Sequence, residues 1–202
     1  MWVSGGDKEA SKTSSETLHI RGEFHETGTL PMAMSQHCSA RINDTHFFIA
    51  GNHEGLQNDA YIVHVDEDDI DKYHYTRLPN MKHQRYGAAC MVLRGTEKND
   101  VSLLVAGGYR FDSFATTEIY SLDTHKWQDG PTLPRGFFYG SYIQYPNGGD
   151  FMMMGGKDDS GTIFDDFMKY NQDTKEFETM PGNLEIGRWS FAATLLLVND
   201  DC

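Results

Sequence analysis

Short apolar runs that end on glycine recur along the chain at nearly regular intervals. They occupy residues 2–6, 47–51, 103–108 and 152–156. The first glycine of each run falls at position 5, 51, 107 or 155, so the interval is 46 to 56 residues. A recurring period of this size is typical of a repeat architecture, either a propeller or a solenoid.

Within one period, the hydrophobic pattern predicts four short strands. In the unit that begins at residue 85, the segments 86–93 and 101–108 are apolar, and 116–122 alternates between apolar and polar positions. A fourth strand begins at Trp127 after a polar turn. Four short strands in about fifty residues, without a helical stretch of three turns, are typical of one propeller blade.

The next period repeats the same plan. Its segments 137–145, 151–156 and 166–170 align with the three strands before it, and Phe177 begins the last strand. The polar turns of the two units also align, at 123–126 and 173–176. The pattern therefore predicts an all-β chain built from repeated antiparallel units.

Residues at fixed places in these units resemble the Kelch repeat motif. In that family a double glycine ends the second strand of a blade, a tyrosine lies in the third, a tryptophan begins the fourth, and an arginine starts the next blade. Several positions depart from the motif: Asn52 replaces a second glycine, Ser35 an arginine, and Phe177 a tryptophan. The residues that carry the resemblance are Gly5, Gly6, Gly51, Gly107, Gly108, Gly155, Gly156, Tyr61, Tyr120, Tyr170, Trp127, Arg85, Arg135 and Arg188.

The resemblance implies a Kelch-type β-propeller of about four blades, each of four antiparallel strands, in a single domain over residues 1–202. We expect blade units at roughly 35–78, 85–134 and 135–181, and one further blade shared by 1–30 and 188–198. Closure of this kind removes exposed sheet edges. Two interpretations stay open: a closed small ring, or part of a larger propeller with further Kelch blades in a longer chain.

Charge and apolar length narrow the classes of partner. The chain has 17 basic and 30 acidic residues, a formal charge of −13, which disfavours nucleic acid and anionic membrane surfaces. No apolar stretch reaches the length of a membrane span, and no signal peptide is visible at residue 1. We therefore expect a cytoplasmic location by default.

The cysteines and one short motif add little at this level. Three scattered cysteines, Cys38, Cys90 and Cys202, predict neither a disulfide framework nor a zinc site. Cys38 and Cys90 lie in apolar strands, where thiols are usually buried and inert. The sequence 43–45 reads Asn-Asp-Thr, which matters only in a secreted protein, so we expect it to be a chance occurrence.

The sequence offers no set of catalytic residues. A copper radical oxidase of the galactose oxidase kind has a similar fold, but it needs two histidines and two tyrosines at one metal, and the nine histidines here are dispersed. The acidic stretch between His64 and His74 lacks the features of a calcium loop, so we expect a solvated turn. We predict no metal site, no cofactor and no enzymatic activity.

Recognition of another protein remains the best expectation. In Kelch proteins the partner usually docks on loops, and residues 109–114 combine Tyr109, Arg110, Phe111 and Phe114, a composition typical of binding hot spots. The alternative is that Phe111 or Phe114 packs back against the blade. Four further residues are expected to add charged contacts: His53, Glu54, Lys157 and Asp158.

The expected function is thus a non-catalytic protein–protein interaction module, a scaffold or adaptor that binds its partner through blade loops. Two alternatives remain. One is a fragment of a larger Kelch propeller without independent function, and the other is a galactose-oxidase-like propeller that processes a small molecule or sugar.

Overall fold

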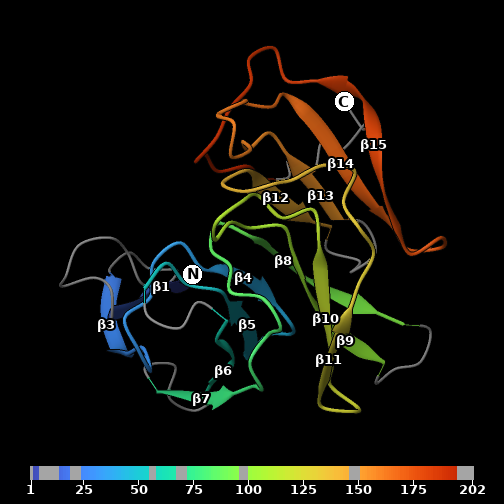
Figure 1. Ribbon diagram of the computed structural model, residues 1–202. Helices are drawn as coiled ribbons and strands as arrows, with labels where there is room; N and C mark the ends of the chain where they lie inside the picture. The colour runs from blue at the N-terminus through green and yellow to red at the C-terminus, as the bar shows by residue number, and fades with distance from the viewer. Residues whose placement is uncertain are drawn as a thin grey trace, which may run out of the picture.

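The computed structural model describes residues 2–4, 14–18, 24–54, 58–66, 72–95, 100–145 and 151–194, with side chains from residue 29 onward. These residues form fifteen strands in four antiparallel sheets, and the described residues contain no helix. In Figure 1 the sheets follow one another in chain order, from blue through green to orange. The expected all-β propeller fold is confirmed.

Three of the sheets have four strands in sequential order, as the repeat predicts. The first contains β4 (Cys38–Arg41), β5 (His46–Ala50), β6 (Ala60–Val65) and β7 (Tyr73–Arg77). The second contains β8 (Ala89–Arg94), β9 (Val101–Ala106), β10 (Thr117–Ser121) and β11 (Lys126–Asp129). The third contains β12 (Ser141–Gln144), β13 (Phe151–Met154), β14 (Asp166–Asn171) and β15 (Glu176–Asn183).

The N-terminal sheet has three strands, β1 (Trp2–Ser4), β2 (Ser14–Leu18) and β3 (Phe24–Thr29). Residues 188–194 form no strand, and residues 195–198 lie outside the described part, so the blade shared by the two ends of the chain stays a prediction. Gly5 and Gly6 of the expected motif, and the acidic residues 67–69, also lie outside it.

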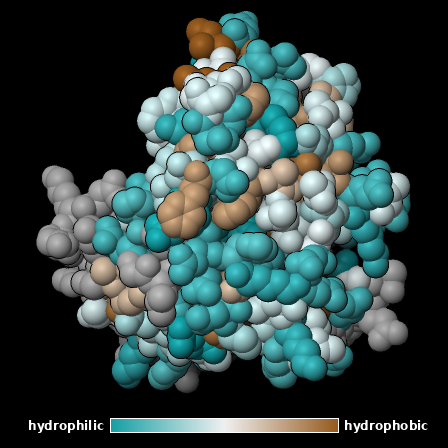
Figure 2. Space-filling model, viewed as in Figure 1, coloured by the Kyte–Doolittle hydropathy of each residue, from teal (hydrophilic) through white to brown (hydrophobic). Residues whose placement is uncertain are grey.

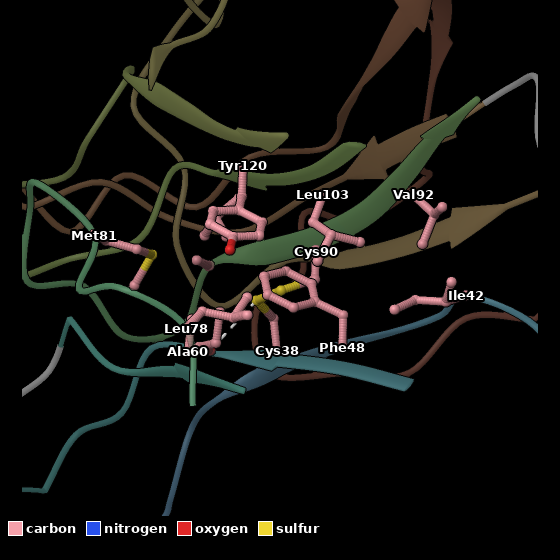
Figure 3. Close-up of a cluster of buried hydrophobic side chains, with 13 residues drawn as sticks. Cys38, Ile42, Phe48, Ala60, Leu78, Met81, Cys90, Val92, Leu103 and Tyr120 are labelled. Carbon is pink, nitrogen blue, oxygen red and sulfur yellow. Dashed lines mark hydrogen bonds between the residues drawn. A yellow bond between two sulfur atoms is a disulfide. The ribbon is translucent and has the colours of Figure 1, made fainter. Parts of the chain in front are cut away.

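Apolar side chains fill the spaces between neighbouring sheets. One cluster, drawn in Figure 3, joins the β4–β7 sheet to the β8–β11 sheet through Phe48, Leu103 and Tyr120, which are at most 2% exposed. A second cluster joins β8–β11 to β12–β15 through Leu104 and Phe151, among others. The motif tyrosines Tyr61, Tyr120 and Tyr170 are all buried.

A ladder of backbone hydrogen bonds runs from blade to blade. Gln36, Gly87, Tyr139 and Ser190 all have φ between 55° and 62°, which is unusual for the three that are not glycine. The N–H of Gly87 donates to Gln36 O (2.8 Å), that of Tyr139 to Gly87 O (2.9 Å), and that of Ser190 to Tyr139 O (2.6 Å). These four residues therefore mark equivalent positions at the start of successive blades.

The glycine pairs are needed where the end of a second strand meets the next blade. Gly107 has φ of 68°, and a Cβ there would lie 2.4 Å from the carbonyl oxygen of Phe137. Its partner Gly108 has φ of 96° and donates its N–H to the same carbonyl (2.6 Å). Any side chain at Gly107 would collide with the following blade. Gly51, Gly155 and Gly156 also have positive φ.

The arginine position of the motif needs one correction. By their hydrogen bonds to the glycine pairs, the backbone positions equivalent to Arg85 are Phe137 and Arg188, so Arg135 lies two residues too early. The side chain of Arg135 nevertheless makes a hydrogen bond equivalent to that of Arg85. Arg85 Nη1 donates to Gly107 O (2.6 Å), and Arg135 Nη2 donates to Gly155 O (3.0 Å). Likewise Ser35 is equivalent to Tyr86 rather than to Arg85.

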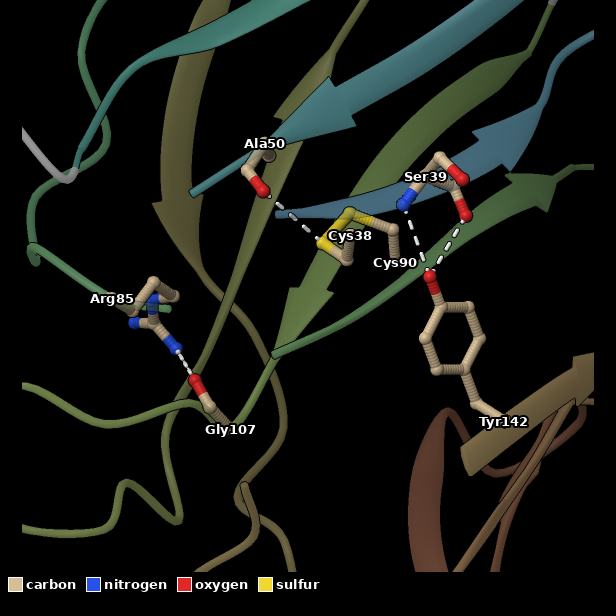
Figure 4. The surroundings of a disulfide bond; sticks show 7 residues. All are labelled: Cys38, Ser39, Ala50, Arg85, Cys90, Gly107 and Tyr142. Carbon is tan, nitrogen blue, oxygen red and sulfur yellow. Dashed lines mark hydrogen bonds between the residues drawn. A yellow bond between two sulfur atoms is a disulfide. The ribbon is translucent and has the colours of Figure 1, made fainter. Parts of the chain in front are cut away.

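A disulfide joins the first strands of two blades. Cys38 in β4 and Cys90 in β8 are bonded, with their Cα atoms 5.4 Å apart and a separation of 52 positions in the sequence. Figure 4 shows the bond beside Ser39 and Tyr142. The two cysteines are buried, as expected, but they are not free thiols. The sequence does not reveal the pairing because it depends on the contact between neighbouring blades.

Candidate binding face

One end of the propeller carries the loops that follow the glycine pairs. His53, Tyr109 and Lys157 occupy equivalent positions in these loops. The N–H of each donates to the start of a blade: to Ser35 O (3.0 Å), Tyr86 O (2.9 Å) and Phe138 O (3.0 Å). We define the loop face as residues 52–54, 109–114 and 157–164 together with the blade starts at 84–86, 138–139 and 188–189. Backbone hydrogen bonds thus hold these loops at fixed places.

In the 109–114 loop, two of the aromatic side chains pack against the protein. The N–H of Phe114 donates to Gly108 O (2.8 Å), and its ring lies 5.1 Å from the Arg85 guanidinium and 5.7 Å from the His83 ring. Tyr109 contacts Tyr86 (ring centroids 5.6 Å apart). Phe114, a binding candidate from the sequence, thus follows the alternative and packs against the blade, so this side chain belongs to the framework of the loop.

Phe111 behaves differently. Its side chain is 81% exposed, the largest exposure among the large hydrophobic residues described. Arg110 lies beside it, with Cζ 4.6 Å from the ring centroid, and donates from Nε to Gln84 Oε1 (3.1 Å). The tip of the loop therefore presents an arginine and an aromatic ring to solvent.

A row of aromatic rings crosses the loop face. Successive ring centroids are separated by 4.7 Å from His53 to Tyr86, 4.8 Å from Tyr109 to Phe138, and 6.1 Å from Tyr139 to Trp189. Burial raises the pKa of Tyr86, so its hydroxyl stays protonated at neutral pH. Sequence reasoning missed Tyr86, Phe138, Tyr139 and Trp189, although all four lie at or next to blade starts.

Lys157 lies over three of these rings. Its Nζ is 3.9 Å from the centroid of Trp189, 5.3 Å from Phe138 and 5.6 Å from Tyr139. A cation over the face of an aromatic ring is attracted by the ring quadrupole. Lys157 therefore stabilises the row of rings instead of extending into solvent.

The remaining candidates are polar residues of the neighbouring loops. Asp158 accepts hydrogen bonds from Ser160 Oγ (2.6 Å) and from the N–H of Thr162 (2.9 Å), and the bond from Ser160 lowers its pKa. His53 Nδ1 lies 3.8 Å from Glu54 Oε1. Ser113 donates to Asp159 Oδ1 (2.8 Å), so the 109–114 and 157–164 loops touch. The candidates of all three loops therefore lie on one face.

The opposite end of the propeller axis contains a cavity of about 510 Å³, which we call the axial cavity. Tyr142 and Gln144 of β12 extend toward the two neighbouring first strands. Tyr142 Oη bonds the N–H and C=O of Ser39 (3.0 Å each), and Gln144 Oε1 accepts from the N–H of Val92 (3.1 Å). These side chains satisfy strand edges that face the axis. Asn43, Arg41 and Arg94 line the remaining space.

Within the described ranges, no group of three histidine, cysteine or acidic side chains is arranged to hold a metal ion, and no helix could span a membrane. The register does bring three dispersed histidines together. His46 stacks on His64 (centroids 4.4 Å apart), and His64 lies 6.1 Å from His74. Parallel stacked rings do not direct their nitrogen lone pairs at one point, so this row forms a packing contact.

The surface in Figure 2 is mostly hydrophilic, and brown apolar side chains appear at its upper edge, above the loops of the last sheet. Ile163 (48% exposed) and Ile186 (67% exposed) belong to these loops. Together with Phe111 and Trp189 they are the exposed large hydrophobic side chains of the described residues.

Comparison with known proteins supports this architecture. The family model of the Kelch motif matches residues 102–134. No curated protein matches the sequence. Among solved structures, that of YjhT matches with a TM-score of 0.63 at 14% identity, covering 79% of this chain and 54% of that one. The chain thus spans about half the length of YjhT, and at this identity the likeness shows the fold alone. The chain therefore contains a Kelch motif at residues 102–134, and its repeated sheets and this likeness show the fold of a Kelch-type β-propeller.

Proposed function

We propose that the chain is a non-catalytic protein–protein interaction module, a scaffold or adaptor that binds another protein through the loop face. The observation that carries the proposal is Phe111, a ring that is 81% exposed at the tip of a loop whose base is held by backbone hydrogen bonds. Exposed aromatic side chains beside arginine are typical of binding hot spots.

The base of the loop is held before a partner arrives. Tyr109, Phe114 and Ser113 each bond or pack against residues outside the loop tip. A loop that is ordered in advance loses less conformational entropy on binding. Arg110 and Phe111 are then available for contact, while the rest of the loop keeps them in position.

Site-specific crosslinking tests this proposal. A photoreactive phenylalanine is placed at Phe111 in one sample and at Lys126 in a matched control, since Lys126 is an exposed residue at the start of β11, outside the loop face. We expect position 111 to capture a discrete protein in cells that make the chain, and Phe111→Ala to weaken recovery of that protein at least tenfold. Identical patterns from both positions would exclude the loop face as the binding surface.

The axial cavity supports a second candidate, a propeller that binds or processes a small molecule or sugar. Two guanidinium groups, from Arg41 and Arg94, line it. Against this candidate, Tyr142 and Gln144 use their polar atoms on neighbouring strands. Calorimetric titration with copper and with a panel of monosaccharides distinguishes the two. Saturable binding that Arg94→Ala abolishes would favour the second candidate.

A further inference from the structure

The disulfide carries information about where the chain folds. Cys38 and Cys90 are bonded at the contact between two blades and are 2% and 1% exposed. Disulfides form and persist in oxidising compartments and are rare in the cytosol. Their formation removes two protons and two electrons from the thiols, which a disulfide of a thiol–disulfide oxidoreductase takes up as it is reduced to a dithiol. The bond therefore indicates an oxidising compartment.

A second and independent signal lies five residues from Cys38. Residues 43–45 read Asn-Asp-Thr, which is an acceptor sequence for N-glycosylation. Such a tripeptide often occurs by chance, and it has chemical meaning only for a chain in the secretory route. The disulfide points to that same route, so the two observations support each other.

The geometry of the turn fits a glycan. Asn43 lies between β4 and β5 and is exposed, as is Asp44. Its Oδ1 accepts hydrogen bonds from the N–H of His46 (2.8 Å), the N–H of Thr45 (3.0 Å) and the Thr45 hydroxyl (3.3 Å). Among the described contacts, Asn43 Nδ2 donates no hydrogen bond, so a sugar attached there displaces none of them.

We propose that the chain folds in an oxidising compartment of the secretory route and carries an N-linked glycan on Asn43. In the transfer, Nδ2 forms a bond to the anomeric carbon of a lipid-linked oligosaccharide. The bond from that carbon to the lipid pyrophosphate breaks, the pyrophosphate leaves with the electron pair, and Nδ2 loses one proton. The proposal replaces the default expectation of a cytoplasmic location.

The position of Asn43 gives the glycan a defined place in the fold. Asn43 lines the axial cavity, near the end of the first strand β4, whereas the loop face lies at the opposite end, where the first strands begin. A glycan there covers the mouth of the axial cavity and leaves Phe111 accessible. The proposed glycosylation is therefore independent of the proposed binding function, and an experiment can refute one proposal without refuting the other.

The first test uses the protein isolated from the cells that make it. Peptide-N-glycosidase digestion in heavy-oxygen water is followed by mass spectrometry of the peptide that contains Asn43, and thiol alkylation of the denatured chain is compared with and without reductant. We expect conversion of Asn43 to a heavy-labelled aspartate, with Cys38 and Cys90 alkylated only after reduction. An unmodified Asn43 peptide, or cysteines alkylated without reductant, would overturn the proposal.

Matched variants secreted from cultured eukaryotic cells test the residues themselves. We expect Thr45→Ala to remove the glycosidase-sensitive mass completely and Thr45→Ser, which keeps the acceptor sequence, to retain it. Asn43→Gln provides a second loss variant, and thermal melting verifies that each variant is folded. Equal mass in the wild-type chain and in folded Thr45→Ala would overturn the assignment to Asn43.

Discussion

The β8–β11 sheet and the β12–β15 sheet have the same strand order and aligned registers, yet they differ in what covers them. Leu104 and Met152 both lie three residues before the first glycine of a pair. Leu104 is 0% exposed because it packs against the next sheet, whereas Met152 at the equivalent position is only half-buried. The burial of a core residue in this repeat is therefore set by its neighbouring blade.

The same contrast appears in the two ion pairs that hold the glycine ends. Arg85 and Glu118 are 0% exposed, whereas the side chains of Arg135 and Asp166 are 16% and 23% exposed. Burial lowers the pKa of Arg85, and Glu118 opposes that shift. In the β8–β11 sheet the desolvated guanidinium of Arg85 therefore depends on the Glu118 carboxylate for stabilisation. In the last sheet the partly exposed Arg135 is also solvated by water.

The largest expected difference between the two sheets comes from removing one carboxylate in each. Glu118→Ala leaves Arg85 buried without its counter-charge and also frees the N–H groups of Lys82 and His83, which bond Glu118 at 2.6 and 3.1 Å. We expect a loss of about 4 kcal/mol in the free energy of unfolding. Asp166→Ala should cost about 1 kcal/mol. Urea denaturation measures both, and equal losses would contradict the comparison.

Truncation of the equivalent core residues should give a smaller difference. Leu104→Ala opens a cavity between two sheets, so we expect it to lower the free energy of unfolding by about 3 kcal/mol. Met152→Ala removes a half-buried side chain, and we expect about 1 kcal/mol. If Met152→Ala cost as much as Leu104→Ala, the last sheet would be as well covered as the middle one.

A half-buried histidine distinguishes the β4–β7 blade from the two that follow. His37 occupies the position of Ala88 and Gly140, and burial lowers its pKa from 6.5 to about 4. The unfolded chain takes up this proton first, so stability falls as the pH drops from about 6.5 toward 4, by about 2 to 3 kcal/mol. His37→Ala should remove this part of the pH dependence in thermal melts at pH 7 and pH 4.5. An unchanged dependence would refute the assignment.

The smallest effect on stability should come from the tip of the 109–114 loop. Phe111→Ala should change the free energy of unfolding by less than about 0.5 kcal/mol because the ring is exposed. Phe114→Ala should cost about 1 kcal/mol because that ring covers the Arg85 guanidinium. Thermal melts of the two variants measure the difference, and a strong destabilisation by Phe111→Ala would show that the ring supports the fold.

The order of the strands was predictable because the residues that determine each strand are close together in the sequence. The apolar runs, the alternation in β10 and the aligned turns each lie within one unit. The structure places strands at the apolar runs and at the alternating segment, and turns at 122–125 and 172–175. The loop candidates were also predictable as a group, since they follow the glycine pairs. What could not be predicted is which aromatic side chain of the loop, Phe111 or Phe114, packs against the blade.

Features that depend on contacts between blades escaped the sequence. The Cys38–Cys90 bond can be predicted only when the distance between two first strands is known. That Phe137 occupies the backbone position equivalent to Arg85 is revealed only by the hydrogen bonds to the glycine pairs. The row of rings on the loop face was accessible in part. Tyr86, Phe138 and Trp189 each directly precede a residue of the ladder, and their spacing of 52 and 51 residues follows the repeat period of the sequence.

The ladder through Gln36, Gly87, Tyr139 and Ser190 sets the spacing between successive blades. Its steps are 51, 52 and 51 residues long, although the 109–114 loop and the 157–164 loop that follow equivalent glycines differ in length by two residues. Each blade is positioned by the hydrogen bond to the preceding ladder residue and not by its loops. The length and composition of a loop can therefore change during evolution without altering how neighbouring blades are placed. The binding specificity of the loop face can then change one blade at a time.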